Sequence, residues 1–321
     1  MRLMQSESND KFAVRAPSVA ILLCTLRGND YLREQLDSIV RQAYTSWSVW
    51  VSDDGSDRST HAILDEYQAS LGNSRLSILR GPAKGFAANF LSLTCNANID
   101  ADYYAYADQD DIWESDKLMQ ALQWLEGIPA DVPALYCART RKVDADNQEI
   151  GFSEKWARPL GFANALVQSI ASGNTMVFNK AACDLLRIAG PDVEVAAHDW
   201  WTYQLVSGSG GRVFHDIYPT VRYRQHSENL IGTNGTWSAR AHRLHMLLKG
   251  RFRNWSKMNI AALETMRAQL TAENQVRLDE FSKARQGGIY SRLAALLRAG
   301  VYRQTWLGNL GLVAAVILKK L

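Results

Sequence analysis

Three carboxylates stand within four residues in the run Asp108-Gln109-Asp110-Asp111. Carboxylates this close together repel one another unless a positive charge lies between them. A hard divalent cation, Mg2+ or Mn2+, takes a few carboxylate oxygens and completes its shell with water and substrate phosphates. The run therefore predicts a metal site beside a diphosphate. The same pattern also suits a solvated acidic loop, or a cap on a helix that begins near Ser115.

A second acidic turn, Asp53-Asp54-Gly55-Ser56-Asp57, lies earlier in the chain. An Asp-Gly turn followed by an N-capping Ser or Asp is an ordinary link from strand to helix, so the turn by itself needs no ligand. A carboxylate in that position can also accept a hydrogen bond from a nucleobase N–H or a ribose hydroxyl. Two acidic turns at neighbouring strand ends favour this second interpretation.

Apolar runs alternate with amphipathic stretches through the first third of the chain. The pattern predicts strands at residues 18–23, 47–51, 76–79 and 103–107, with helices at 31–42, 60–71 and 85–94 between them. Such a βαβαβαβ order predicts an α/β fold, with a mostly parallel sheet and helices on both faces. Ligands bind such sheets beyond the carboxyl ends of the strands, which is where both acidic turns fall.

The later part of the chain divides into a mixed region and a helical one. We predict helices at 115–125, 180–188 and 198–206 and strands at 134–140 and 175–178, while residues 151–171 show no clear pattern. From about Arg240 the pattern is helical, basic and aromatic. The predicted organisation is a polar leader at 1–16, an α/β domain at 17–236 and a helical C-terminal extension at 237–321.

Composition limits the classes of partner and compartment. The 36 Lys and Arg residues exceed the 33 Asp and Glu residues by only three, too small an excess to indicate a nucleic-acid partner. Four widely spaced cysteines, Cys24, Cys95, Cys137 and Cys183, suggest reduced, buried thiols rather than disulfides or a zinc site. The chain shows no signal-peptide core or membrane-spanning run, so the expected compartment is the cytoplasm.

The order of motifs along the chain resembles one known family. Cys24-Thr25-Leu26-Arg27 is followed by Asp53-Asp54-Gly55-Ser56, then by Lys84-Gly85-Phe86-Ala87-Ala88-Asn89-Phe90, and then by Ala107-Asp108-Gln109-Asp110-Asp111-Ile112-Trp113. As a set this resembles the inverting family-2 glycosyltransferases, which have a GT-A fold. Together with a later His-Asp-Trp-Trp, the set is similar to bacterial rhamnosyltransferases of polysaccharide and O-antigen assembly. The resemblance covers roughly residues 17–232.

The resemblance implies a role for each motif. For the nucleotide-sugar donor it implies a pyrimidine contact by Asp54, with the remaining contacts coming from Thr25, Arg27, Lys84, Asn89, Asp108 and Gln109. It makes Asp110 the direct ligand of Mg2+ or Mn2+, assigns Asp108 to ribose or metal, and gives Asp111 a supporting position.

An inverting transfer also needs a base that takes the proton of the acceptor hydroxyl. By resemblance this base is Asp199 in His198-Asp199-Trp200-Trp201. Family members carry an acidic residue where His198 stands, so no role carries over to it. The residues alone also fit a helix start with an acid in its first turn and tryptophans in the core.

Three further features have open interpretations. His226 is either a third metal ligand, a donor to the phosphates or a surface histidine, and Arg222 and Arg224 are either diphosphate contacts or exposed cations. Gly173-Asn174 lines an acceptor cleft or forms a simple turn.

The extension combines cations with aromatic residues. No acidic residue lies between Glu228 and Glu264, whereas six cations do, and Trp237, Phe252, Trp255 and Trp306 lie among the basic residues of the C-terminal segment. This suits peripheral contact with an anionic membrane, where a lipid-linked glycan acceptor is found. Packing on the α/β domain and a dimer contact are the alternatives.

The resulting hypothesis is an inverting glycosyltransferase that moves L-rhamnose from dTDP-L-rhamnose, or another sugar from a dTDP- or UDP-linked donor, to a cell-surface glycan. We expect it at the inner face of the cytoplasmic membrane. A metal-dependent sugar nucleotidyltransferase is one alternative, but a Gly-rich phosphate loop is missing after the first predicted strand. A non-catalytic scaffold is the other, and the presence of both Asp110 and Asp199 weighs against it.

Overall fold

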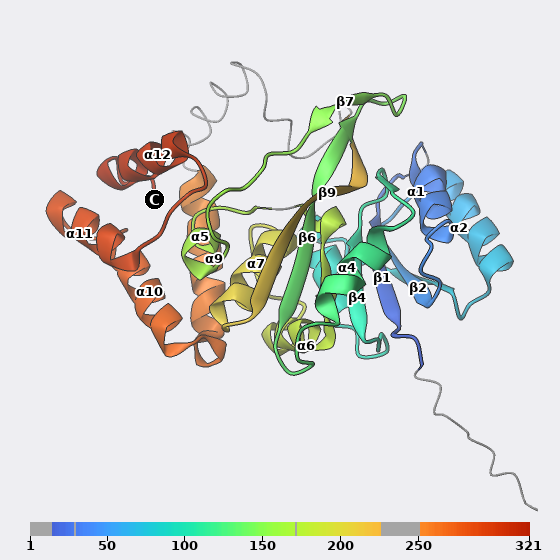
Figure 1. Cartoon of the computed structure of the whole chain (residues 1–321), viewed down its shortest axis with the longest axis horizontal. Helices are drawn as coiled ribbons and strands as arrows, with labels where there is room; N and C mark the ends of the chain where they lie inside the picture. Colours follow the sequence, from blue (N-terminus) through green and yellow to red (C-terminus); the bar gives the residue numbers. More distant parts are fainter. Residues whose placement is uncertain (1–14, 29, 171, 226–250) are drawn as a thin grey trace, which may run out of the picture.

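The computed structural model describes residues 15–28, 30–170, 172–225 and 251–321 (Figure 1). One mixed sheet runs through this part of the molecule, in the strand order β3-β2-β1-β4-β8-β6-β9-β5, and β7 pairs with β6 outside that path. The strands are β1 Val19–Thr25, β2 Trp47–Asp53, β3 Leu76–Arg80, β4 Tyr103–Ala107, β5 Ile112–Trp113, β6 Ala134–Val143, β7 Glu149–Phe152, β8 Val177–Asn179 and β9 Arg212–Arg224.

The predicted parallel half is confirmed. Strands β3, β2, β1 and β4 are parallel neighbours, so their carboxyl ends meet at one edge. All seven residues of β1 are buried, and successive side chains enter opposite layers. Ala20 and Leu22 join the core on one face of the sheet, whereas Ile21 and Leu23 join the core on the other. Burial on both faces explains why the sequence of this strand is almost entirely apolar.

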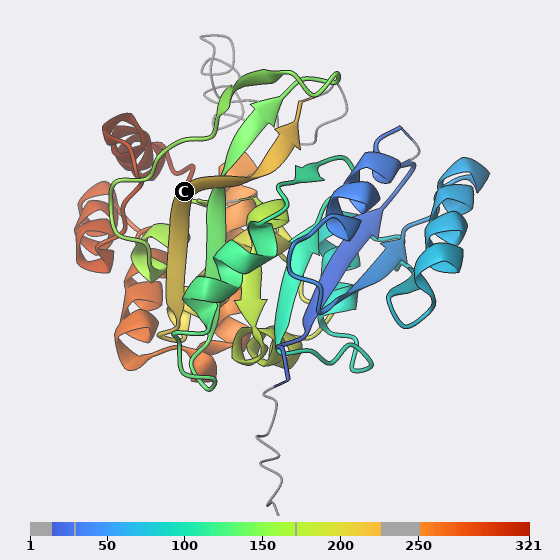
Figure 2. The same cartoon turned by 45° about the vertical axis from the view of Figure 1, so that its right-hand side comes forward.

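Helices cover both faces of the sheet (Figures 1 and 2). They are α1 Leu32–Val40, α2 Arg58–Leu71, α3 Phe86–Thr94, α4 Lys117–Leu125, α5 Phe162–Ala165, α6 Lys180–Ala189 and α7 His198–Gly208, with a 3-10 turn at Gly173–Thr175. Buried residues of α1, α2 and α4 share one core, and those of α3, α6 and α7 share the other. All helices predicted between residues 31 and 206 are present, with ends that differ by a few residues.

The second half of the sheet departs from a parallel arrangement. Strand β8 is antiparallel to both β4 and β6, β5 is antiparallel to β9, and only β6 and β9 are parallel there. The prediction omitted β5 and β7 and gave no bounds for β9. The reason is physical. Strands β5 and β7 have only two and four residues, and β9 mixes apolar and polar residues with no regular alternation of burial, so none of the three has a clear apolar period.

Four helices form the described C-terminal part: α9 Arg251–Thr265, α10 Ala272–Lys283, α11 Ile289–Ala299 and α12 Trp306–Ile317. They stack beside α5 and α7, at the end of the molecule away from α1 and α2 (Figure 1). Leu263, Leu278 and Phe281 are fully buried in the same core as Trp201 of α7. The Asn274 amide donates hydrogen bonds to the carbonyl oxygens of Ser207 and Gly208, at 3.3 and 3.0 Å. These helices therefore complete one core rather than forming a separate one.

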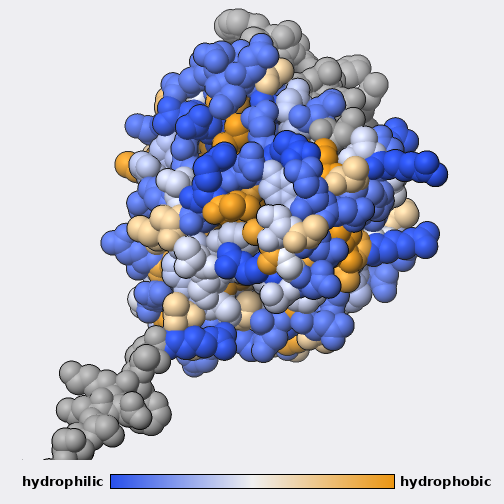
Figure 3. Space-filling model, turned by 90° about the vertical axis from the view of Figure 1, so that its right-hand side faces the viewer, coloured by the Kyte–Doolittle hydropathy of each residue, from blue (hydrophilic) through white to orange (hydrophobic). Residues whose placement is uncertain are grey.

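The described residues can be compared with what a membrane-associated protein would need. Among the described residues, no helix is both long and apolar enough to cross a bilayer. The end of the molecule that carries α1 and α2 is largely hydrophilic, with scattered apolar residues (Figure 3). Helix α12 is different, because Trp306, Leu310, Val313 and Ile317 recur at helical spacing and are all exposed.

The cysteine prediction holds for three of the four thiols. All four are unpaired, and Cys24, Cys137 and Cys183 are buried. Cys95 is only partly buried, because it follows the last residue of α3, where the chain leaves the core.

Candidate active site

A pocket of about 360 Å3 opens where β2 and β3 end. Its lining residues are Asp53, Asp54, Gly55, His61, Ile78, Leu79, Arg80, Gly81 and Ala83. The Asp54 carboxylate accepts a hydrogen bond from the backbone N–H of Ala83 at 2.5 Å. A Cβ on residue 81 would lie 2.6 Å from the same oxygen, so glycine permits this close approach. The carboxylate is thus fixed at the pocket wall and retains further acceptor positions for a ligand.

Gln109 joins the ends of β1 and β4. Its Oε1 atom accepts hydrogen bonds from the Thr25 hydroxyl and the Leu26 N–H, both at 2.8 Å, and its Nε2 atom donates to the Leu26 carbonyl at 3.0 Å. A Cβ on residue 28 would lie 2.5 Å from Gln109 Oε1. The structure thus brings Thr25 and Gln109 together as partners of each other, so the loop after β1 and the acidic run are coupled.

The remaining donor-binding candidates have different surroundings. Arg27 is exposed, has a left-handed backbone (φ 53°), and donates its N–H to the Ser56 hydroxyl at 2.9 Å. Lys84 is exposed and forms an ion pair with Asp192 at 3.2 Å. Asn89 is 2% exposed and holds the end of β2, since its amide donates to the carbonyl of Ser52 at 3.2 Å. Arg27 and Lys84 are therefore accessible, whereas Asn89 supports the strand end from beneath.

The three carboxylates of the acidic run have two environments. Asp108 and Asp110 are partly exposed, whereas Asp111 is fully buried and accepts hydrogen bonds from the Asn174 amide and the Arg224 N–H. Burial and then the charges of Asp110 and Asp199 raise the pKa of Asp108. Burial is also the main cause of the raised pKa of Asp111. Asp108 and Asp110 therefore keep access to solvent, and Asp111 anchors the turn below them.

Beneath the acidic run lies a buried cation that the sequence did not single out. Lys117 is completely buried, donates from Nζ to the carbonyl of Asn174 at 2.7 Å, and lies 3.5 Å from the centre of the Trp113 ring. Burial lowers its pKa, and the charges of Asp111 and Asp108 partly oppose this effect. A lysine at the start of an amphipathic helix carries no sequence signal for such a position.

Arg224 is a second buried cation in this region. It is 1% exposed and donates to the carbonyl of Asp110 at 3.1 Å and to the carboxylate of Glu34 at 2.7 Å. The expectation of an exposed cation is therefore wrong for Arg224, which holds the backbone of the acidic run. Arg222 is partly exposed and pairs with Glu114 at 2.9 Å.

Asp108 and Asp110 suit a hard divalent cation. Their oxygens are the ligand type that Mg2+ and Mn2+ prefer, and burial together with the charges of Asp110 and Asp199 raises the pKa of Asp108, so a nearby cation would favour its ionised form. In the described ranges no group of three or more His, Cys, Asp or Glu side chains surrounds a common position. Mg2+ often takes one or two protein carboxylates and completes its shell with phosphate and water, so two suffice. His226 lies outside the described residues.

Asp199 begins α7 at the same edge of the sheet. It is partly buried and accepts a hydrogen bond from the Trp200 N–H at 2.6 Å. Burial raises its pKa to about 6, although hydrogen bonds from the N–H groups of Trp200 and Gly173 act in the opposite direction. The charge of Asp199 contributes to the raised pKa of Asp108, so the two carboxylates lie within electrostatic range of each other. A carboxylate with this pKa is ionised at neutral pH yet basic enough to take a proton.

His198 lies in an aromatic enclosure beside Asp199. Its ring stacks on Phe90 with 3.9 Å between centres and meets Tyr106 edge-on at 4.8 Å. Burial lowers the pKa of His198 to about 3, so the ring is neutral, and neither ring nitrogen has a hydrogen-bond partner among the described residues. A Cβ on residue 173 would lie 2.5 Å from its Nε2 atom, so Gly173 makes room for the imidazole.

The helix interpretation of the His-Asp-Trp-Trp motif is also correct. Asp199 lies in the first turn of α7, and Trp200 and Trp201 are buried. Trp200 stacks on Phe252 and meets Trp255 edge-on, with 6.5 and 6.3 Å between ring centres. These two aromatic residues of the C-terminal segment therefore pack on the α/β domain.

Comparison with known proteins gives a family match. Residues 20–183 match Glycosyl transferase family 2. The chain is similar to the dTDP-rhamnosyl transferase RfbG of Shigella flexneri, with 28% identity over 239 residues that cover 70% of this chain and 78% of that protein.

Two solved structures share the fold. The mannosyltransferase PcManGT from Pyrobaculum calidifontis, in complex with GDP-Man and Mn2+, has a TM-score of 0.51 and 19% identity, and the alignment covers 96% of this chain and 86% of that chain. S. aureus TarS 1-349 in complex with UDP-GlcNAc has a TM-score of 0.53 and 13% identity, with 94% and 88% covered. These likenesses identify a GT-A-like α/β fold.

Proposed function

Because the chain belongs to Glycosyl transferase family 2, we propose that it is an inverting transferase that moves L-rhamnose from dTDP-L-rhamnose to a hydroxyl of a cell-surface glycan. The observation that supports the reaction type is that the charges of Asp199 and Asp110 both act on Asp108, so the proposed base and the proposed metal ligands lie within electrostatic range of one another. The donor sugar rests on similarity to the dTDP-rhamnosyl transferase RfbG.

In this proposal the donor lies along the carboxyl ends of β2, β1 and β4. The pyrimidine enters the pocket at Asp54, whose fixed carboxylate accepts its N–H. Thr25, Arg27 and Lys84 lie along the nucleotide, and Gln109 keeps the loop after β1 in register with the acidic run.

Asp110 is the direct ligand of Mg2+ or Mn2+, and Asp108 is shared between ribose and metal. When bound, the cation stabilises the negative charge that grows on the leaving diphosphate. Asp111 stays outside the shell, because Asn174 and Arg224 already occupy its oxygens. The buried cations Lys117 and Arg224 keep the turn in place from below.

Asp199 acts as the general base. Its carboxylate takes the proton of the acceptor hydroxyl as that oxygen bonds to the anomeric carbon, while the bond from that carbon to the diphosphate breaks on the opposite face. A pKa of about 6 keeps most of this base ionised at pH 7. His198 remains neutral throughout and forms part of the apolar wall with Phe90 and Tyr106.

We further place the enzyme in the cytoplasm, at the inner face of the cytoplasmic membrane, through α12. Trp306 and Leu310 are 73% and 48% exposed, and Lys319 and Lys320 follow the helix. An apolar stripe flanked by cations suits an anionic lipid surface, where a lipid-linked acceptor is found. Phe252 and Trp255 do not take part, since both pack on Trp200.

Calorimetric titration of dTDP, UDP and GDP with and without Mn2+ tests the donor proposal. We expect Mn2+-dependent binding of dTDP. Failure of all three nucleotides to bind would remove the donor from the proposal. Transfer assays with dTDP-L-rhamnose and purified glycan acceptors then test the sugar itself.

A further inference from the structure

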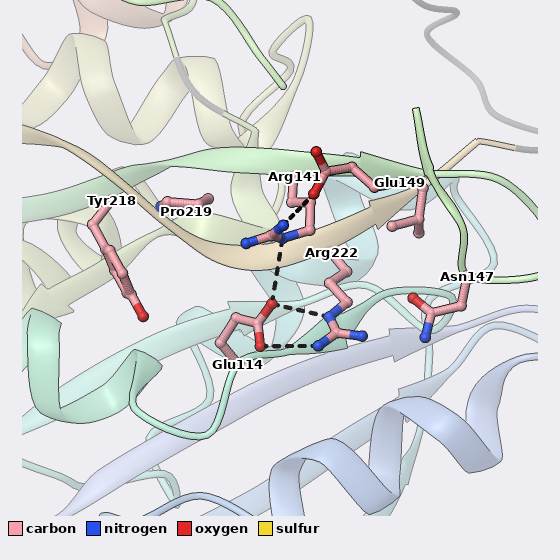
Figure 4. A pocket seen from close by; sticks show the side chains of 8 residues that line it. Glu114, Arg141, Asn147, Glu149, Tyr218, Pro219 and Arg222 are labelled. Carbon is pink, nitrogen blue, oxygen red and sulfur yellow. Dashed lines mark hydrogen bonds and ion pairs between the residues drawn. The ribbon is translucent and has the colours of Figure 1, made fainter. Parts of the chain in front are cut away.

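A second pocket, of about 320 Å3, lies on the other half of the sheet, between β5, β6, β7 and β9 (Figure 4). Its lining residues are Glu114, Arg141, Val143, Asn147, Glu149, Tyr218, Pro219 and Arg222. The volume is within the range of small-ligand pockets. Among its lining residues only Arg222 was a candidate contact of the donor diphosphate, and its guanidinium pairs with Glu114 instead. The proposed donor site therefore leaves this pocket without a function.

The charged side chains of this pocket neutralise one another. Glu114 accepts hydrogen bonds from Arg222 Nε at 2.9 Å and Nη2 at 3.3 Å, and Arg141 pairs with Glu149 (Figure 4). Two guanidinium groups therefore face two carboxylates. The two carboxylates would repel a phosphate, and the two guanidinium groups would repel a metal ion. The pocket therefore suits a neutral ligand.

Two polar atoms in the same pocket have no hydrogen-bond partner. Arg141 Nε is shielded from solvent and lies 3.7 Å from Glu114 Oε1, within ion-pair reach but beyond hydrogen-bond distance. Asn147 Oδ1 is also shielded and unpaired. Because neither atom can be reached from the pocket, a ligand would bind the outer groups of the wall instead. The side chains of Arg141 and Glu149 are 34% and 44% exposed, so they can donate hydrogen bonds to a ligand and accept them from it.

An aromatic ring completes the lining. Tyr218 is 46% exposed and enters from β9, and its backbone N–H is fixed by Asp216 at 2.9 Å. Exposed aromatic rings present an apolar face beside polar edges. Sugars carry hydroxyls that both donate and accept, together with an apolar ring face of C–H groups. The pocket matches that combination.

The pocket lies close to the acidic run along two strands. Glu114 is three residues beyond Asp111 across β5, and Arg222 is two residues before Arg224, whose N–H bonds to Asp111. Three residues of extended chain span about 10 Å. A sugar unit in the pocket would therefore lie a short stretch of glycan away from the reaction centre.

We propose that this pocket is a saccharide-binding subsite that holds a neutral unit of the acceptor glycan. This proposal rests on the proposed transferase function. In it, the exposed end of the Arg141 guanidinium and the Asn147 amide nitrogen donate to sugar hydroxyls, the Glu149 carboxylate accepts from another, and Tyr218 packs against the ring. The subsite selects longer acceptors and leaves donor binding unchanged.

Saturation-transfer NMR with simple glycosides tests the subsite directly. The probes are the methyl glycosides of α-L-rhamnose, α-D-mannose, β-D-glucose and N-acetyl-β-D-glucosamine, added to protein saturated with dTDP and Mn2+ so that the donor site is filled. Asn147→Gly removes the side-chain amide and keeps the left-handed backbone (φ 61°) without strain. Tyr218→Ala removes the ring, and Tyr290→Ala, at an 87% exposed position on α11, is the matched control.

We expect at least one glycoside to bind, with a Kd that rises about fivefold or more in Asn147→Gly and in Tyr218→Ala and stays unchanged in Tyr290→Ala. The proposal is overturned if no glycoside binds, or if both pocket variants bind it as the native protein does. Calorimetry of dTDP on the same proteins reports on the donor site separately. Loss of nucleotide binding in the native protein would count against the transferase function, whereas intact dTDP binding without glycoside binding would reject only the subsite.

Discussion

The assignment of Asp199 as general base predicts how transfer varies with pH. The base must be ionised to accept the proton, so activity falls as the pH falls through its pKa. With a pKa of about 6, the ionised fraction is about 91% at pH 7 and about 9% at pH 5. We therefore expect kcat/KM to drop about tenfold between pH 7 and pH 5 and to be nearly constant from pH 7 to pH 8.

The same assignment gives the effect of Asp199→Asn. The amide keeps the size of the side chain and an oxygen that accepts from the Trp200 N–H, but it cannot take a proton. Removal of a general base costs about 10²- to 10⁴-fold in rate. Binding of dTDP with Mn2+ should stay within about twofold of native, because Asp199 lies on the acceptor side. Asp131→Asn, at an exposed carboxylate, is the matched control and should retain full transfer.

The assay measures initial rates of transfer from dTDP-L-rhamnose to a purified glycan acceptor, at saturating Mn2+ and at half-unit steps from pH 5 to pH 8. Circular dichroism at each pH confirms that the protein remains folded. Undiminished transfer by Asp199→Asn would refute the assignment. A native profile that stays flat between pH 5 and pH 7 would refute the pKa argument even if the variant is inactive.

Further predictions concern the metal site, the buried cation, the histidine and α12. Asp110→Ala should abolish the Mn2+-dependent part of dTDP binding measured by calorimetry; an unchanged Mn2+ dependence would exclude Asp110 as the ligand. Lys117→Met should lower the free energy of unfolding by about 2 kcal/mol in urea titrations, because it leaves the buried carbonyl of Asn174 without its hydrogen-bond donor. A change below about 1 kcal/mol would show that the buried cation contributes little. His198→Phe should leave the urea midpoint nearly unchanged, since the neutral ring has no partner to lose; a large loss of stability would indicate a hydrogen bond to the imidazole. The double variant Trp306→Glu and Leu310→Glu should reduce co-sedimentation with phosphatidylglycerol vesicles at least fivefold while dTDP binding stays intact, and equal sedimentation of the two proteins would argue against membrane contact through α12.

Sequence patterns were sufficient for the elements whose burial has a clear period. The apolar runs at β1 and β2 and the amphipathic helices α1 and α4 are where the pattern placed them, because each buries a regular face. The acidic turns were also found at the strand ends, since that position follows from a parallel sheet. Local order was therefore predictable wherever the core itself is regular.

The details of the candidate site depend on contacts between residues that are far apart in the sequence. Asn174 binds Asp111 across 63 positions, and Lys117 reaches the Asn174 carbonyl across 57. Neither contact can be recognised from the local sequence, so the residue pattern alone did not separate Asp111 from Asp108 and Asp110; only the family resemblance gave Asp111 a supporting position. The two-residue strand β5 exists only because β9 pairs with it. The unpaired state of His198 likewise depends on Phe90 and Tyr106, which come from two other elements.

The packing of the C-terminal helices has a consequence for engineering. One way to direct a glycosyltransferase to another acceptor or surface is to replace its C-terminal extension with that of a related enzyme. In this chain Asn274 binds the last carbonyls of α7, and Phe252 and Trp255 lie against Trp200, the neighbour of Asp199. A chimera that replaces residues 251–321 would therefore alter the support of its own catalytic helix. Substitution of the exposed stripe of α12 alone, with Leu312 and Val316 kept because they are buried in the core, is the more conservative change.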